Sequence, residues 1–338
     1  MKHLLVNSMG FLMWFLICTQ AAMGASPLTK TKVSAETLAK IEKANTLLKL
    51  NKTGDAILLL KPISADLPRH GLLSLSKAYH AQKNYLEETR ILEIIIGQND
   101  KDYYVQNLLA ECYLANRELE KAADNFSLAK ELKHDYLPAY LGLEKTYESK
   151  GQFDDARLIF NDMIRIFGAK KEYLNEICRL YSIEGSVQEG IDACQKATMS
   201  DPSLSTNHIF LGRMLIENDQ AERGEMIILK AAKQFQKSDA AQIAAATIKF
   251  KHKQWHAASD IYAQSTIANP NSDEGFIGWA RSLFEMQKYN DAKIAYTKAC
   301  SLNKKYLSDL RNAIAVLRQK DQIVLANQYE SILPRCGG

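Results

Sequence analysis

Apolar and aromatic residues recur along this chain at a constant interval of 34 residues. The most regular column holds tyrosine or leucine at Tyr79, Tyr113, Tyr147, Tyr181, Leu215 and Leu283. A second column, four positions earlier, holds Leu75, Leu109, Leu143, Ile177, Leu211, Ala245 and Trp279. A third column, nine positions after the first, consists mainly of small residues, namely Glu88, Ala122, Ala156, Gly190, Gly224, Ala258 and Ala292. Mostly large apolar residues follow four positions later, at Leu92, Phe126, Phe160, Cys194, Ile228, Tyr262 and Tyr296.

These columns predict two amphipathic helices in every interval. Residues three or four positions apart lie on one face of an α-helix, so each pair of neighbouring columns forms one apolar stripe. A short polar turn, such as residues 149–152, separates the two stripes. Small residues on the second helix allow the first helix to pack closely against it. Because a single helix pair cannot bury its own apolar face, we expect successive pairs to stack into an all-α array.

The columns resemble those of the tetratricopeptide repeat, and the unit at 103–136, which contains LLAECYLANRELEKAADNFSLAKEL, is close to the consensus of that family. Seven units run in unbroken register over 69–306. A shorter first unit begins near Thr37, and a last unit ends before Pro334. The resemblance therefore implies a right-handed α-solenoid of about nine units over 37–333, which leaves little chain for a second domain.

Three charged residues depart from the repeat pattern. Glu88 and Glu144 stand where other units have small residues, and Lys249 interrupts the tyrosine column beside Phe250. Two interpretations stay open for these positions: bends in the array, or charged side chains that extend to water.

The first 25 residues have the order of a cleaved export signal. Lys2 and His3 form a short basic start, an unbroken apolar stretch follows at 11–18, and small residues stand near 21–25. An uncleaved anchor is the weaker alternative, because this stretch is shorter than the roughly 20 residues of a membrane span. Ile17 argues against a lipoprotein signal at Cys18. We predict a signal peptide at 1–25, a linker at 26–36, and a periplasmic or secreted chain with no integral membrane span after cleavage.

Charge and motifs point away from several classes of function. Lys and Arg number 43 against 39 Asp and Glu, a balance that does not favour nucleic-acid binding. The sequence contains no HExxH, GxSxG, GxxxxGK[ST] or GxGxxG motif. His252 and His256 are four positions apart but flank a predicted turn, so we expect surface histidines rather than metal ligands. We predict no catalytic residues, no cofactor and no metal.

Five cysteines follow the predicted signal, at Cys112, Cys178, Cys194, Cys300 and Cys336, and none forms a CxxC pair. Cys178 and Cys194 belong to one unit and stand in inward-facing columns of its two helices. Two interpretations stay open for them: a disulfide worth about 3 kcal/mol, or two buried thiols that act as small apolar residues. We expect Cys336 to be a mobile thiol in a tail at 334–338.

The resemblance also implies a binding surface, because first helices line the concave side in this family. The column two positions before the tyrosines is mostly basic and comprises Lys77, Glu111, Lys145, Arg179, Arg213, Thr247 and Arg281. Asn107 and Asn175 stand four positions before two members of this column. The predicted groove residues are therefore Lys77, Asn107, Lys145, Asn175, Arg179, Arg213 and Arg281.

Arginine side chains bind carboxylates and phosphates in a two-point fashion, so this groove is expected to take acidic or extended segments of partner proteins. The alternative is a solvated helix face on which Arg213 pairs with Glu217 and Arg281 with Glu285.

Three hypotheses for function follow. The first is a non-enzymatic interaction scaffold in the bacterial cell envelope, where exported members of the family take part in assembly, secretion or appendage systems and in envelope complexes. The second is an accessory protein of polysaccharide export that binds an anionic glycan. The third, an enzyme, lacks support from any reactive cluster in the sequence.

Overall fold

The structure, a computed structural model, describes residues 33–337. In this part of the chain all regular elements are helical, and eighteen α-helices follow one another as nine pairs. The chain divides into two compact units, of which unit 1 ends at Asp100 and unit 2 begins at Lys101. The predicted signal peptide at 1–25 and most of the predicted linker at 26–36 lie outside the described residues.

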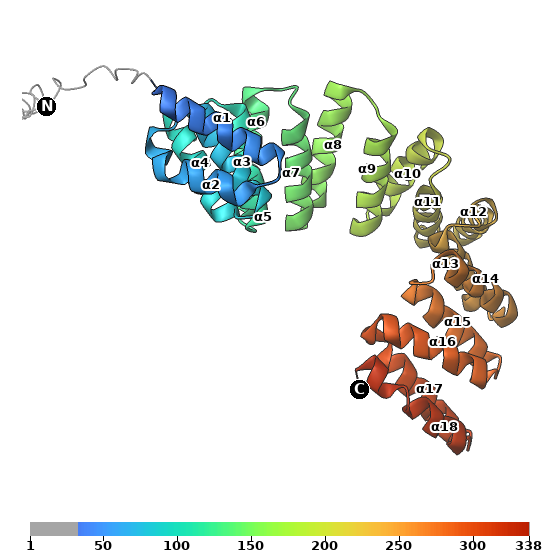
Figure 1. The fold of residues 1–338 in the computed structure, drawn as a ribbon. Helices are drawn as coiled ribbons and strands as arrows, with labels where there is room; N and C mark the ends of the chain where they lie inside the picture. Colours follow the sequence, from blue (N-terminus) through green and yellow to red (C-terminus); the bar gives the residue numbers. More distant parts are fainter. Residues whose placement is uncertain (1–32, 338) are drawn as a thin grey trace, which may run out of the picture. The chain divides into compact units, whose positions relative to one another are not determined.

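Unit 1 contains two helix pairs (Figure 1), formed by α1 (Ala35–Lys49), α2 (Thr53–Leu60), the 3-10 helix η1 (Lys61–Asp66), α3 (Arg69–Ala81) and α4 (Tyr85–Gln98). Unit 2 begins with α5 (Tyr103–Ala115), α6 (Leu119–Leu132), α7 (Leu137–Lys150), α8 (Phe153–Phe167), α9 (Lys171–Glu184), α10 (Val187–Ser200), α11 (Ser205–Glu217) and α12 (Ala221–Gln234). It continues with α13 (Asp239–Lys251), α14 (Trp255–Ala268), α15 (Asp273–Glu285), α16 (Tyr289–Leu302), η2 (Lys304–Tyr306), α17 (Leu307–Gln319), α18 (Ile323–Glu330) and η3 (Leu333–Cys336).

The repeating columns form the core, as the sequence predicts. Tyr79, Leu109, Leu143, Phe126 and Tyr296 are all buried. Small residues bring the two helices of a pair together, as at Gly224 of α12. A Cβ atom on Gly224 would lie 2.3 Å from the carbonyl oxygen of Gly212 in α11, so only glycine fits at this point.

A left-handed residue ends the first helix of every pair. This residue recurs at the 34-residue interval, at Lys83, Arg117, Gly151, Gly185, Asp219, Lys253, Gln287 and Asp321. Asn51 has the same role in the first pair, 32 positions before Lys83, so that pair is two residues shorter than the others. A residue with positive φ reverses the chain after a helix, and the repeat therefore fixes the turn geometry even where the residue is not glycine.

Two of the three departures from the pattern have a clear structural outcome. Glu88 does not extend to water, because its side chain is only 1% exposed. Lys249 is half-buried, and Phe250 beside it packs on Trp255 with ring centroids 4.7 Å apart.

The C-terminal end differs from the expected mobile tail. Residues 333–336 form η3, and Cys336 is buried and bonded to Cys300 of α16. The sequence gives little sign of this pairing because the two cysteines are 36 positions apart and belong to different helix pairs. Between Ala35 and Cys336, no helix has both the length and the apolar character needed to cross a bilayer.

Candidate functional site

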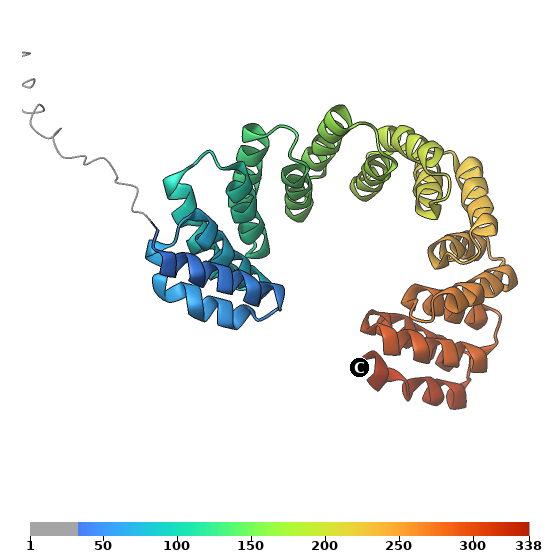
Figure 2. The same cartoon turned by 45° about the horizontal axis from the view of Figure 1, so that its top comes forward.

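Unit 2 is a row of successive helix pairs (Figure 2), and several of its first helices contact the first helix of the next pair. α5 contacts α7, and α11 contacts both α9 and α13, which in turn contacts α15. We call the surface formed by α5, α7, α9, α11, α13 and α15 the first-helix face. Six predicted groove residues come from these helices, namely Asn107, Lys145, Asn175, Arg179, Arg213 and Arg281. Lys77 is exposed on α3 and belongs to unit 1.

Arg179 forms ion pairs with two carboxylates that also belong to unit 2. Its Nε donates to Oε2 of Glu176 at 2.5 Å, and its Nη2 donates to Glu148 of α7. Burial opposes the charge of Arg179, but the hydrogen bonds to Glu148 and Glu176 outweigh burial and raise the pKa of the guanidinium. Arg179 thus already has two anionic partners within the chain.

Glu144 adds a third carboxyl group to this cluster. Burial first, and then the neighbouring carboxylates of Glu148 and Glu176, raise the pKa of Glu144 to about 7, although Arg179 acts to lower it. Near neutral pH the Glu144 carboxyl therefore exchanges a proton with solvent, and the charge of the cluster changes with it.

Arg281 pairs with a residue of the following repeat. Its Nε donates to Oδ1 of Asp309 in α17 at 2.8 Å, so Arg281 does not rely on Glu285 one turn away. The two residues border a pocket of about 230 Å³ together with Phe284 and Tyr296. This arrangement places Arg281 between helices and not on a purely solvated face.

Asn107 and Asn175 also bond within unit 2. Asn107 is buried and donates from Nδ2 to Oε1 of Glu111 at 2.8 Å. Asn175 accepts from Nδ2 of Asn207 in α11 at 2.7 Å, which joins two first helices through their amides.

Arg213 differs from Arg179 and Arg281 because it forms no ion pair with any residue in 33–337. It is exposed on α11 and borders a pocket of about 370 Å³ on the first-helix face. The pocket is lined by three successive first helices and the turn before α15, through Thr206, Ile209, Phe210, Arg213, Asp239, Ala240, Ile243, Asn269, Asn271, Ser272, Asp273 and Glu274. Lys145 is likewise exposed, on α7, but does not line this pocket.

The pocket combines an apolar base with a charged rim. Ile209, Phe210 and Ile243 supply the apolar side chains. Asp239 and Asp273 are the first residues of α13 and α15, where a carboxylate is favoured by the helix dipole. This combination of apolar surface with a few polar groups is typical of a binding pocket for a side chain or small molecule.

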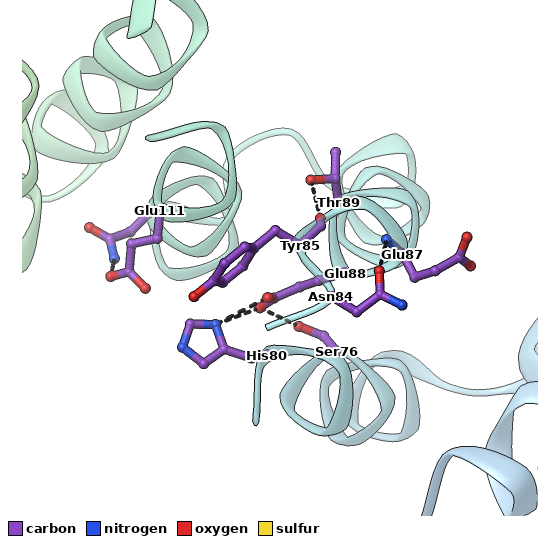
Figure 3. Close-up of polar contacts among 9 residues, drawn as sticks. Ser76, His80, Asn84, Tyr85, Glu87, Glu88, Thr89 and Glu111 are labelled. Carbon is purple, nitrogen blue, oxygen red and sulfur yellow. Dashed lines mark hydrogen bonds and ion pairs between the residues drawn. The ribbon is translucent and has the colours of Figure 1, made fainter. Parts of the chain in front are cut away.

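Glu88 forms a second polar cluster, in unit 1, and its carboxylate is directed at His80 (Figure 3). The Nδ1 atom of His80 lies 3.0 Å from Oε2 of Glu88, and the Ser76 hydroxyl donates to Oε1 of Glu88 at 3.3 Å. In a catalytic triad the serine hydroxyl is hydrogen-bonded to the histidine, and the imidazole accepts the proton of the serine. Because Ser76 is buried and bonded to the carboxylate, these three residues do not form a catalytic triad.

Cys178 and Cys194 form a disulfide in the structure. Their sulfur atoms are 2.03 Å apart and their Cα atoms 4.6 Å apart, which links α9 to α10. Both residues are fully buried in the core of that pair. The sequence left open a disulfide or two buried thiols, and the structure has the disulfide.

Two structural features cannot be predicted from the repeat pattern. Phe210 and Glu274 are single members of variable columns, and only stacking of α11, α13 and α15 brings them to one pocket. Arg157 of α8 is buried, lies 4.0 Å from the ring centre of Tyr181 and pairs with Glu184 of α9. The partner of a buried arginine depends on neighbouring repeats, which one repeat unit does not reveal.

Within residues 33–337, no group of three or more His, Cys, Asp or Glu side chains is arranged so that it could hold a metal ion. His252 follows the end of α13, and its Nε2 lies 2.9 Å from Glu225, while His256 lies beyond the turn on α14.

Comparison with solved structures identifies the fold. The C-terminal part of a TPR repeat-containing protein from Cytophaga hutchinsonii is similar to this chain, with a TM-score of 0.50 and 15% identity over 66% of this chain and 92% of that one. A tetratricopeptide repeat protein from Parabacteroides merdae gives a TM-score of 0.48 and 13% identity over 74% of this chain and 100% of that one. No family model matches the sequence, and no curated protein matches it. The chain is thus an all-α array of helix pairs with a tetratricopeptide-repeat-like fold.

Proposed function

We propose that this protein is a non-enzymatic scaffold that binds partner proteins on the first-helix face of unit 2. The observation that carries the proposal is the pocket at Arg213, which three successive first helices line. A surface shared by several repeats suits an extended segment, because each repeat contributes one set of contacts along its length.

The proposed location is the bacterial cell envelope, after export and removal of residues 1–25. Two disulfides, Cys178–Cys194 and Cys300–Cys336, support an oxidising compartment. An anionic glycan as ligand is less well supported, because Arg179 and Arg281 already bind carboxylates of the chain. The mass of the protein purified from its native envelope would test the export step. We expect a chain without residues 1–25, and a mass that includes them would contradict the proposal.

Site-specific photocrosslinking would test the binding surface. A photoreactive amino acid at Thr206, which lines the pocket, is expected to capture a protein partner in intact cells. The matched control is the same amino acid at Met226 of α12, which is exposed on a second helix and does not line this pocket. Equal capture at both positions, or capture at Met226 alone, would contradict the proposed surface.

A further inference from the structure

The charges around the Arg213 pocket do not match an acidic ligand. Three carboxylates line it, from Asp239, Asp273 and Glu274, against the single guanidinium of Arg213. Lys305 lies 3.2 Å from Asp273 and compensates that charge. The remaining rim still carries two carboxylates for one guanidinium, so the pocket favours a cation.

Two of these carboxylates keep a negative charge that no cation of the described residues compensates in an ion pair. Oδ2 of Asp239 accepts from Asn269 at 2.7 Å, a neutral amide that leaves the negative charge in place. Glu274 is exposed and forms no ion pair with the residues described in 33–337. By contrast, Asp273 accepts from Asn303 and Tyr306 in addition to its contact with Lys305. The free negative charge of the pocket therefore lies at Asp239 and Glu274.

The base of the pocket suits a long aliphatic chain. Ile209 is buried, and Phe210 and Ile243 are half-buried, so their side chains offer apolar surface beside the carboxylates. Lysine and arginine place their methylene groups on apolar surface while the charged end reaches polar partners. An acidic side chain is shorter and would meet the carboxylates with a like charge.

We propose that the pocket binds a lysine or arginine side chain of an extended partner segment. The alkyl part of that side chain lies on Phe210 and Ile243, and its charged end lies between Asp239 and Glu274. Arg213 donates hydrogen bonds to carbonyl oxygens of the segment's backbone. This inference rests on the proposed function, because it names the chemistry of the segment bound on the first-helix face.

Selection from a peptide library tests this proposal with the full-length purified chain. Random decapeptides are photocrosslinked to the protein through a photoreactive residue at Thr206, and the captured peptides are sequenced. We expect lysine or arginine to be enriched at one position. Affinity for a selected peptide should fall about threefold to fivefold in Glu274→Gln, the scale of one partly exposed ion pair. Glu222→Gln on α12, outside the pocket, should leave this affinity unchanged.

The charge-reversed variant Glu274→Lys makes the selection decisive. With Arg213 and the new lysine on the rim, enrichment should shift from basic to acidic residues, while circular dichroism confirms an intact helical fold. Captured peptides without a basic preference, or with the same preference in Glu274→Lys, would overturn the inference and leave the proposed function standing. Failure to capture any peptide at Thr206 would overturn both.

Discussion

The carboxylate of Glu88 lies 3.0 Å from Nδ1 of His80, at a position where the other repeats carry alanine or glycine. Glu88 is buried, whereas His80 is half-exposed at the end of α3. Burying a carboxylate costs several kcal/mol unless hydrogen bonds and charges compensate it. The His80 imidazole is one of the groups that offset the cost of burying the Glu88 carboxylate in unit 1.

A double-mutant cycle would measure this coupling. His80→Ala is expected to destabilise unit 1 by about 1–3 kcal/mol, because it removes a partner from a buried carboxylate. In the Glu88→Ala background, which restores the small residue of the column, the same His80→Ala change should be close to neutral. Hydrogen exchange of α3 and α4 amides gives the local stability. His70→Ala, at an exposed position of α3, is the control, and equal effects of His80→Ala in both backgrounds would contradict the coupling.

The Cys178–Cys194 disulfide should contribute to the stability of unit 2. It closes a loop of 16 residues, and the loss of such a link costs about 3 kcal/mol in the chain-entropy description. We expect Cys178→Ala/Cys194→Ala to lower the free energy of unfolding by that amount, measured in urea. A second measurement compares the Cys300→Ala/Cys336→Ala variant with and without reductant. In this variant the reductant can break only the Cys178–Cys194 bond. A reductant that leaves the stability of that variant unchanged would contradict the prediction.

The helical repeat is predictable from sequence because its signal is repeated many times. Each column reports the same packing position, and a single departure such as Lys249 does not obscure the others. The left-handed turn residues are harder to find, since lysine, arginine, aspartate and glutamine take a conformation usually associated with glycine. There the 34-residue register, and not the residue type, indicates the geometry.

The charges of the first-helix face could not be predicted in the same way. A helix pattern suggests Glu285 as the partner of Arg281, one turn away, but the structure pairs Arg281 with Asp309, 28 positions later. Arg179 similarly binds Glu148 of the preceding repeat. Which carboxylate an arginine selects depends on the stacking of neighbouring repeats, and a row of basic residues therefore does not by itself define a cationic groove.

Glu144 should make the stability of unit 2 depend on pH. Its pKa of about 7 in the folded chain lies above the usual glutamate value of 4.5. The folded state therefore holds the proton more tightly, and stability falls as pH rises from about 4.5 through 7. Glu144→Gln remains neutral, so the variant should be more stable than the wild type at pH 8 by about 1–2 kcal/mol, after allowance for partial solvent exposure.

Urea unfolding at pH 5 and pH 8 would test this dependence. The advantage of Glu144→Gln should nearly disappear at pH 5, where the carboxyl of the wild type is protonated in the folded state. Glu172→Gln, at an exposed position of α9, is the control for the loss of one acidic group. A pH-independent difference between wild type and Glu144→Gln would show that burial does not raise the pKa as described.

The left-handed turn position offers a direct test of the repeat geometry. Lys253 has a φ of 58° between α13 and α14, a conformation in which a side chain costs about 1 kcal/mol relative to glycine. Lys253→Gly should therefore stabilise the protein by up to about 1 kcal/mol, and Gly185→Ala, at the equivalent turn, should destabilise it by a similar amount. The neighbouring Gln254 has a φ of −85°, so Gln254→Gly should give no gain. Thermal unfolding of the three variants, followed by circular dichroism, compares these effects, and a loss of stability in Lys253→Gly would show that the lysine side chain contributes more at this turn than the backbone conformation costs.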